Sequence, residues 1–245
     1  MSVKMRRILI TGSNRGIGLD LVRRYLQYED TMVFATCRNP AGATTLTNLA
    51  SQFPERLRVL ELDVTDQESI DESRRRVGAE VDGLDMLVNN AGILPGGVAS
   101  MEARSAKFGS LETSAMMEVF HVNTVAPVMV AQTFADLLRR GTNARVINVT
   151  SDAGSITLRE NGCNYSYPAS KAALNMLTRC LAGSFRDDGV IVIAIHPGWI
   201  RTDMGGPQAR LSLDEAIPSM MKVIDGLTMN DTGAFFNWDG THIPW

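Results

Sequence analysis

The fold of this chain is decided by residues 8–18, Ile8-Leu9-Ile10-Thr11-Gly12-Ser13-Asn14-Arg15-Gly16-Ile17-Gly18. The apolar run that opens this stretch predicts a short buried strand. Thr11-Gly12 then breaks the run into a glycine-rich turn, and a helical pattern follows through Ile17, Leu21 and Leu26. Strand, tight turn and helix in direct succession are typical of the first unit of an α/β fold.

Strand-like and helix-like segments alternate along the rest of the chain. Further strands are predicted at residues 32–36, 58–62, 84–88, 146–149, 190–195 and 234–237. Helices are predicted at 41–53, after Asp66 as N-cap, at 111–140 with a break or kink at Pro127, at 167–185 and at 213–225. The early strands are continuously apolar, so we expect both sheet faces to be covered. The sequence therefore predicts one domain over residues 1–245, a doubly wound parallel sheet with helices on both faces.

Composition excludes several classes of protein. The 245 residues carry a formal charge of −3 and are 44% apolar, which leaves no basic footprint for nucleic acid. The three cysteines, at 37, 163 and 180, include no Cys-x-x-Cys pair, so neither a disulfide framework nor a metal site is expected. No apolar run approaches the roughly 18 residues of a membrane-spanning helix. We expect a cytoplasmic protein with no nucleic-acid or membrane partner.

The glycine turn is a candidate phosphate site. Glycines at 12, 16 and 18 let the backbone approach a pyrophosphate, which would lie at the positive end of the following helix. The spacing is Gly-x-x-x-Gly-x-Gly and not Gly-x-Gly-x-x-Gly, so a plain structural turn remains the alternative. The candidate cofactor-binding residues are Gly12, Ser13, Asn14, Arg15, Gly16, Ile17 and Gly18.

The end of the second strand indicates which dinucleotide is bound. An acidic residue there would bind the ribose 2′-hydroxyl of NAD, but the chain reads Thr36-Cys37-Arg38. The guanidinium of Arg38 suits a 2′-phosphate, and Arg15 could reach the same group. These two arginines predict NADPH/NADP+ as the cofactor; the alternative is that both are solvated surface side chains.

Tyr167 and Lys171 form the candidate catalytic pair. Four residues apart on one helix, their side chains share a face. A free tyrosine has a pKa of about 10, and a cation within roughly 4–6 Å lowers such a value by about 1–3 units. We therefore expect Tyr167 to act as a general acid. Tyr165 is the rival phenol, but its partner four residues on is Ala169.

Other candidate residues fall at the same predicted sheet edge. Ser151 ends the fifth strand, where its hydroxyl can bond a carbonyl oxygen; the neighbouring Thr150 is the alternative hydroxyl. Asn123 lies in the long preceding helix, and Asn89-Asn90-Ala91-Gly92 ends the fourth strand. The histidines at 121 and 196 have no ligand spacing, and packing or simple hydrogen bonding is their expected role.

A further motif, Pro197-Gly198-Trp199-Ile200-Arg201-Thr202, follows the sixth predicted strand. Together with the motifs described above, it completes an order of motifs that is known for one family. Over essentially its whole length the chain resembles the short-chain dehydrogenase/reductase family, whose fold is of the Rossmann type. The endings His196-Pro197-Gly198-Trp199, Phe236-Asn237-Trp238-Asp239-Gly240 and Ile243-Pro244-Trp245 are similar to the sniffer/C-factor branch, which includes carbonyl reductases. One departure is the longer segment between Ser151 and Tyr167, through residues 159–163.

The resemblance implies a role for each site residue. Tyr167 would donate the proton, Ser151 would orient the carbonyl, and Lys171 would hold the nicotinamide ribose while lowering the tyrosine pKa. Asn123 would seat a water in the proton relay. The remaining cofactor contacts would come from Arg38, Asp63, Val64, Asn90, Ala91, Gly92, Pro197, Gly198, Ile200 and Thr202.

The expected activity is NADPH-dependent reduction of aldehyde, ketone or quinone carbonyls. Besides Ser151 and Tyr167, the substrate pocket would include Leu94, Ala153, Trp199 and Met204, whose apolar character favours small hydrophobic carbonyls. The substrate loop is expected at about residues 199–215. Alternatives are oxidation of a secondary alcohol and an NADP-binding signalling or scaffold protein without significant turnover. The resemblance further suggests a homodimer or homotetramer.

Overall fold

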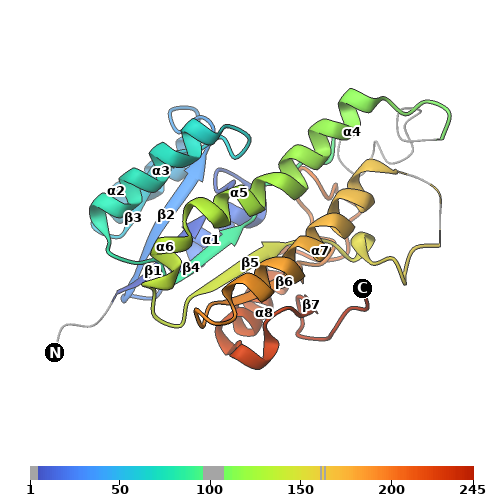
Figure 1. The fold of residues 1–245 in the computed structure, drawn as a ribbon. Coiled ribbons are helices and arrows are strands. Elements are labelled where there is room, and N and C mark those ends of the chain that lie inside the picture. The colour runs from blue at the N-terminus through green and yellow to red at the C-terminus, as the bar shows by residue number, and fades with distance from the viewer. Residues whose placement is uncertain (1–4, 96–107, 161, 163) are drawn as a thin grey trace.

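Seven parallel strands form a single sheet in the order β3-β2-β1-β4-β5-β6-β7 (Figure 1). The computed structural model describes residues 5–95, 108–160, 162 and 164–245. Within them the strands are β1 Arg6–Ile10, β2 Thr31–Cys37, β3 Leu57–Glu61, β4 Met86–Asn89, β5 Arg145–Val149, β6 Ile191–His196 and β7 Phe235–Asn237. Every predicted strand is present, with ends displaced by one or two residues, and the predicted doubly wound parallel sheet is confirmed.

Helices cover both faces of this sheet. Those described are α1 Gly16–Tyr25, α2 Thr44–Gln52, α3 Gln67–Glu80, α4 Thr113–Phe120, α5 Ala126–Thr133, α6 Ala135–Arg139, α7 Ser166–Phe185 and α8 Leu213–Gly226. Short turns of other helix types lie at η3 His121–Val125, η4 Asp152–Gly154 and η5 Met229–Asp231. Asp66 caps α3 as predicted, because its side chain accepts a hydrogen bond from the Glu68 amide. The predicted loop 199–215 ends earlier than expected, since α8 begins at Leu213.

The long helix predicted over residues 111–140 is broken in the way that Pro127 requires. Proline has no N–H, so it cannot donate to the Asn123 carbonyl four residues earlier. In the π-helical turn η3, which precedes Pro127, the backbone hydrogen bonds join residues five apart and not four. A second break at Phe134 separates α5 from α6.

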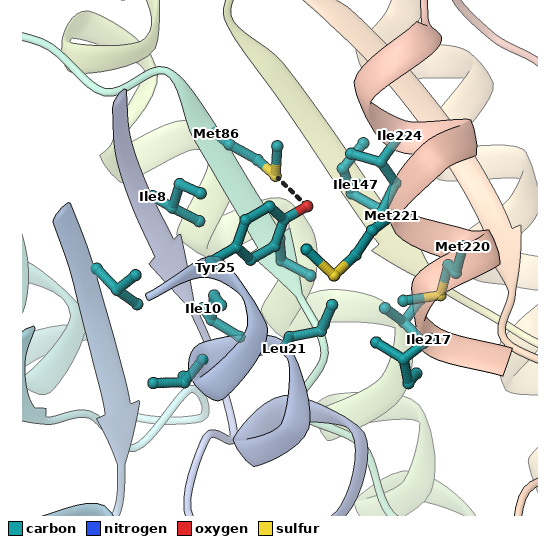
Figure 2. Close-up of a cluster of buried hydrophobic side chains, with 14 of the residues drawn as sticks. Ile8, Ile10, Leu21, Tyr25, Met86, Ile147, Ile217, Met220, Met221 and Ile224 are labelled. Atoms are coloured by element: carbon teal, nitrogen blue, oxygen red, sulfur yellow. Dashed lines mark hydrogen bonds between the residues drawn. The ribbon is translucent and has the colours of Figure 1, made fainter. Parts of the chain in front are cut away.

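The core has two layers because alternate strand residues point to opposite faces. Ile8 and Ile10 pack with α1, α2 and α8, whereas Leu9 packs with α3, α5, α6 and α7. Figure 2 shows part of the first layer, with the Tyr25 hydroxyl directed at the Met86 sulfur, 3.8 Å away. Burial on both faces explains why the strands are continuously apolar and not alternating.

Within the described residues, one helical stretch, Thr113–Thr133, is long and apolar enough to cross a membrane by composition. It packs against α7 and α3. Thr124 in this stretch is buried and donates a hydrogen bond to the Ser170 carbonyl of α7, 2.8 Å away. These contacts are those of a helix packed on a sheet, so its composition is weak evidence for a membrane span.

The topology brings the strand ends that carry polar motifs to one edge. β1 pairs with β2 on one side and with β4 on the other, so the direction of winding reverses between β1 and β4. Ligands of open α/β sheets bind outside the carboxyl ends of the strands at such a reversal. The glycine turn after β1 lies at this point.

The opposite end of β1 is held by a buried ion pair that offers a test of the fold. Asp85 accepts hydrogen bonds from the Arg7 amide (2.8 Å), the Arg7 guanidinium (2.9 and 2.7 Å) and the Thr142 amide (2.6 Å). Although burial opposes ionisation, these bonds hold the pKa of Asp85 below its usual value.

Replacing Asp85 by Ala should lower the free energy of unfolding by about 3 kcal/mol, because Arg7 would stay buried without its partner. Urea unfolding followed by circular dichroism measures the change. Asp82→Ala, an exposed carboxylate three residues away, is the matched control and should have little effect. Equal losses in both variants would contradict the assignment.

Candidate active site

A cavity of about 680 Å³ lies outside the carboxyl ends of the strands, where the topology predicts a ligand site. Most of the sequence-predicted residues line it together. They are Gly12, Asn14, Arg15, Gly16, Ile17, Arg38, Asp63, Val64, Asn90, Ala91, Gly92, Leu94, Ser151, Ala153, Tyr167, Lys171, Pro197, Gly198, Trp199, Ile200, Thr202 and Met204. Three do not line it: Ser13, Gly18 and Asn123.

The glycine turn forms one wall of the cavity. Gly12 has a φ of +68°, and a Cβ there would lie 2.9 Å from the Ala91 Cα, so the position admits only glycine. Ser13 is fully buried behind this wall, with its hydroxyl donating to the Ile10 carbonyl over 2.7 Å. Gly18 also lies behind it, where a Cβ would meet the Gly12 carbonyl oxygen at 2.3 Å. Ser13 and Gly18 thus shape the turn from behind.

Two residues tie the glycine turn to the end of β4. The Thr11 hydroxyl accepts hydrogen bonds from the Asn90 and Ala91 amides, both 3.0 Å away. The Asn90 side-chain amide in turn donates to the Thr11 carbonyl (2.9 Å) and the Gly12 carbonyl (3.0 Å). Sequence reasoning missed Thr11, because its partners are about 80 positions away along the chain.

The first turn of α1 fits a phosphate-bearing group. No side chain caps it, and it contains no acidic residue that would repel an anion. Arg15 precedes it and forms an exposed 3.3 Å ion pair with Asp203 of the loop after β6. Arg38 lies at the end of β2 on the same cavity. The donors are therefore two arginines and a helix N-terminus, a set suited to phosphates.

Asp63 lies at the same end of the cavity. Burial opposes its ionisation, but hydrogen bonds from Thr65 and the charges of Arg38 and His121 hold its pKa below the usual value. The carboxylate oxygen accepts from the Thr65 amide (2.9 Å) and hydroxyl (2.6 Å). Asp63 therefore remains ionised beside the arginine that would face a 2′-phosphate.

Tyr167, Ser151 and Lys171 meet at the other end of the cavity. The Ser151 hydroxyl lies close enough to the Tyr167 phenol to favour its ionised form and so to oppose the rise of its pKa. The Lys171 ammonium lies 5.8 Å from the centre of the Tyr167 ring and donates to the Val149 carbonyl over 2.9 Å. Both Ser151 and Lys171 are buried, with 8% and 5% of their surface exposed.

The expected lowering of the Tyr167 pKa is not what the structure gives. Burial raises the pKa of Tyr167 to about 12, despite the nearby Ser151 hydroxyl, which favours the phenolate. Burial also lowers the pKa of Lys171 to about 8. Each shift favours the neutral form, because a charge in a buried site loses its hydration. The sequence argument counted the attraction between the two groups and not the cost of burying them.

The alternative hydroxyls are engaged elsewhere. Thr150 donates to the Asn175 side-chain oxygen of α7, 2.8 Å away, and is buried. Tyr165 is half-exposed, with its ring 6.3 Å from that of Phe108. Geometry thus favours Ser151 over Thr150 and Tyr167 over Tyr165 as groups directed at a ligand.

Asn123 is fully buried in η3, behind the cavity wall. Its side-chain oxygen accepts from the Ile93 amide (2.8 Å), and its nitrogen donates to the Ile93 carbonyl (2.9 Å) and the Ser170 hydroxyl (3.2 Å). These bonds fix the segment after β4 against α7. Asn123 therefore has a structural role in this structure, in which it connects the segment after β4 to α7.

Sequence reasoning missed several residues that line the cavity, among them Cys37, Glu118, His121, Asp152 and His196. His121 and His196 were expected only to pack, yet both face this space. A signal was present for His196 and Asp152, since each adjoins a motif at a strand end. Within the described residues, no group of three or more His, Cys, Asp or Glu side chains could hold a metal ion.

The lowered pKa of Lys171 can be measured directly, because the chain contains only four lysines, at 4, 107, 171 and 222. In protein labelled with ¹³C at the lysine ε-carbon, one resonance should titrate with a midpoint near pH 8. That resonance should be missing from the Lys171→Met variant. A midpoint at the ordinary value of about 10.5 would contradict the burial argument.

Comparison with known proteins agrees with this architecture. The model of the family described as short chain dehydrogenase matches residues 6–211. C-signal of Myxococcus xanthus is 37% identical over 162 residues, which are 66% of this chain and 93% of that protein. An uncharacterized oxidoreductase of Schizosaccharomyces pombe is 33% identical over the full length of both chains.

Two solved structures are similar throughout. An NADPH-bound carbonyl reductase from chicken fatty liver is 40% identical, with a TM-score of 0.89 over 99% of this chain and 100% of that one. Carbonyl reductase Sniffer of Drosophila melanogaster is 33% identical, with a TM-score of 0.91 over 98% and 100% of the two chains. The chain belongs to the short chain dehydrogenase family.

Proposed function

We propose that this protein is an oxidoreductase that reduces aldehyde, ketone or quinone carbonyls with NADPH. The observation that carries the proposal is that Ser151, Tyr167 and Lys171 line one cavity together with the glycine turn, Arg15 and Arg38. The NADPH bound to the chicken carbonyl reductase, a chain 40% identical, supports the choice of cofactor.

NADPH would be held by the glycine turn and the first turn of α1, with Arg15 and Arg38 at its 2′-phosphate, and it would supply a hydride. Asn90, Ala91 and Gly92 would face its ribose, and Ile200 and Thr202 its carboxamide. Asp63 and Val64 would flank its adenine. All of these residues line the one cavity.

The chain's own residues would act on the carbonyl oxygen. Ser151 and Tyr167 present two hydroxyls at one point, where they can bond that oxygen and polarise the carbonyl. As the carbonyl carbon accepts the hydride, Tyr167 transfers its proton to the oxygen, and an alcohol results. Lys171, one turn further along α7, offers a positive charge to the transient phenolate.

The substrate would lie against an apolar wall. Leu94, Ala153, Trp199 and Met204 line the cavity near Ser151, which favours small hydrophobic carbonyls. The Trp199 indole donates to the Gly205 carbonyl over 2.8 Å, and Ile200 pairs with Leu211. The loop that carries Trp199 and Met204 is thus closed on itself at its base.

Two alternatives remain testable with the same protein. The site could oxidise a secondary alcohol, since the same groups serve the reverse reaction. A relative named C-signal, 37% identical, supports the second alternative, an NADP-binding signalling protein without significant turnover. Steady oxidation of NADPH in the presence of a panel of quinones and aldehydes would support carbonyl reduction over both alcohol oxidation and a signalling role without turnover.

The assembly that we propose is a homodimer or homotetramer. Met117 on α4, Val125 on η3 and Met176 on α7 are large apolar side chains exposed to solvent. Since α4, η3 and α7 pack side by side, these side chains could be covered by a second copy.

Tyr167→Phe should lower kcat for carbonyl reduction by at least about 10²-fold, because the ring keeps its packing but has no proton to donate. The variant should still bind NADPH, as measured by the quenching of protein fluorescence. Tyr165→Phe is the matched control and should retain turnover. Equal activity in Tyr167→Phe and the wild-type protein would exclude Tyr167 as the acid.

Arg38→Asp should shift the cofactor preference from NADPH toward NADH by about 10²-fold in kcat/KM, since the aspartate repels a 2′-phosphate and can accept from a 2′-hydroxyl. Kinetics with both cofactors and one saturating carbonyl measure the ratio. An unmoved ratio would show that Arg38 is a solvated surface side chain.

A further inference from the structure

A carboxylate and an imidazole adjoin the Ser151–Tyr167 pair, and the reaction as described above leaves them unused. Asp152 is the first residue of η4, directly after Ser151, and His196 is the last residue of β6. Both line the same cavity as Ser151 and Tyr167.

One oxygen of Asp152 connects the four side chains. It accepts hydrogen bonds from the Ser151 hydroxyl, 3.1 Å away, and from the Ala153 amide, 2.8 Å away. The same oxygen lies 3.6 Å from Nε2 of His196. Ser151 in turn adjoins Tyr167, so Tyr167, Ser151, Asp152 and His196 form a row of neighbouring side chains.

The two groups differ in burial. The Asp152 side chain is 58% exposed, so it can stay ionised in contact with solvent, whereas the His196 side chain is only 12% exposed. Within the described part of the chain, Nδ1 of His196 is buried without a hydrogen-bond partner. A neutral ring tolerates this position, and a protonated ring would have to bury an unpaired N–H.

Building on the proposed function, we propose that Asp152 and His196 are positioning residues, in which Asp152 holds the Ser151 hydroxyl and the charge on His196 controls how strongly the carboxylate acts on Tyr167. In the resting site Ser151 donates to Asp152. When a substrate carbonyl oxygen accepts the hydrogen bond of the Ser151 hydroxyl, Asp152 keeps the Ala153 amide and His196 as partners. The Asp152–His196 pair therefore orients the Ser151 hydroxyl before the substrate binds. Loss of the Ser151–Asp152 hydrogen bond on substrate binding leaves the Asp152 oxygen with its other two partners.

The sign of the effect follows from the charges. The Asp152 carboxylate disfavours a phenolate at Tyr167 and contributes to raising the pKa of Tyr167. Burial lowers the pKa of His196 below 6.5, and Asp152 opposes that lowering. As the pH falls through the pKa of His196, the imidazolium offsets the carboxylate, and proton donation by Tyr167 becomes easier. Reduction should therefore become faster in this pH range.

Other charged groups face the same space. Lys171 of α7 lies beside Tyr167, Glu118 and His121 come from α4 and η3, and Asp203 from the loop after β6. Asp203 is paired with Arg15 and is 77% exposed. None of these groups contacts the Asp152 oxygen that bonds Ser151. Asp187, an exposed carboxylate in the turn after α7 that does not line the cavity, is a suitable control.

The first test needs no turnover. The chain has three histidines, at 121, 196 and 242, so the imidazole resonances can be assigned and titrated by NMR. His196 should titrate below 6.5 in the wild-type protein. In Asp152→Asn its midpoint should fall by about one further pH unit, because the attracting charge is gone. An unshifted midpoint would overturn the pairing.

The second test is the pH dependence of kcat with saturating NADPH and a neutral carbonyl. The wild-type protein and Asp187→Asn should show a rise as the pH falls through the His196 midpoint. His196→Gln should lack that rise, and in Asp152→Asn the rise should move to lower pH together with the His196 midpoint. Asp152→Ala should in addition lower kcat by about tenfold or more, since the Ser151 hydroxyl then has no side-chain acceptor at residue 152, whereas Asn can still accept its hydrogen bond.

The same rise in His196→Gln as in the wild-type protein would overturn the proposal. If the wild-type protein reduces no carbonyl at any pH, the proposed function fails, and the NMR midpoints still decide whether Asp152 and His196 act as a pair.

Discussion

Burial of both faces of the parallel sheet is the constraint on which the rest of this structure depends. Because the strands offer mainly apolar side chains to the two helical layers, most polar side chains of the strand motifs gather beyond the carboxyl ends. There the reversal of winding between β1 and β4 opens a space that no crossover helix covers. The cavity is thus a consequence of the sheet, and the polar motifs line it because they follow buried strands.

The same burial shapes the chemistry of the site. Lys171 is buried and Tyr167 is half-buried where they line the cavity, and the pKa of each group shifts so as to favour its neutral form. A tyrosine with a pKa near 12 remains a proton donor over the whole neutral range. A lysine with a pKa near 8 is mostly protonated at neutral pH and lies close to its transition. Burial therefore keeps the phenol protonated, and the charges around it adjust how readily the proton leaves.

Hydrogen bonds between distant segments make the cavity rigid. Thr11 and Asn90 tie the glycine turn to β4, and Asn123 ties the segment after β4 to α7. Asn123 lies in η3, the π-helical turn that precedes Pro127, and its side chain is fully buried there. A helix irregularity that could be read as a defect is therefore part of the support of the site.

The sequence by itself determined the seven strands, the winding of the sheet and the strand ends at which a site could form, because hydrophobic periodicity and glycine turns are local properties. It also singled out Ser151, Tyr167 and Lys171 as a group. Only the tertiary structure decided that Thr150 bonds Asn175, that Asn123, Ser13 and Gly18 lie behind the cavity wall, and that burial raises the pKa of Tyr167. The Asp152–His196 contact also came from the fold alone. Distances between residues 44 positions apart, and the loss of hydration at a buried group, depend on how the layers pack, and no local pattern records them.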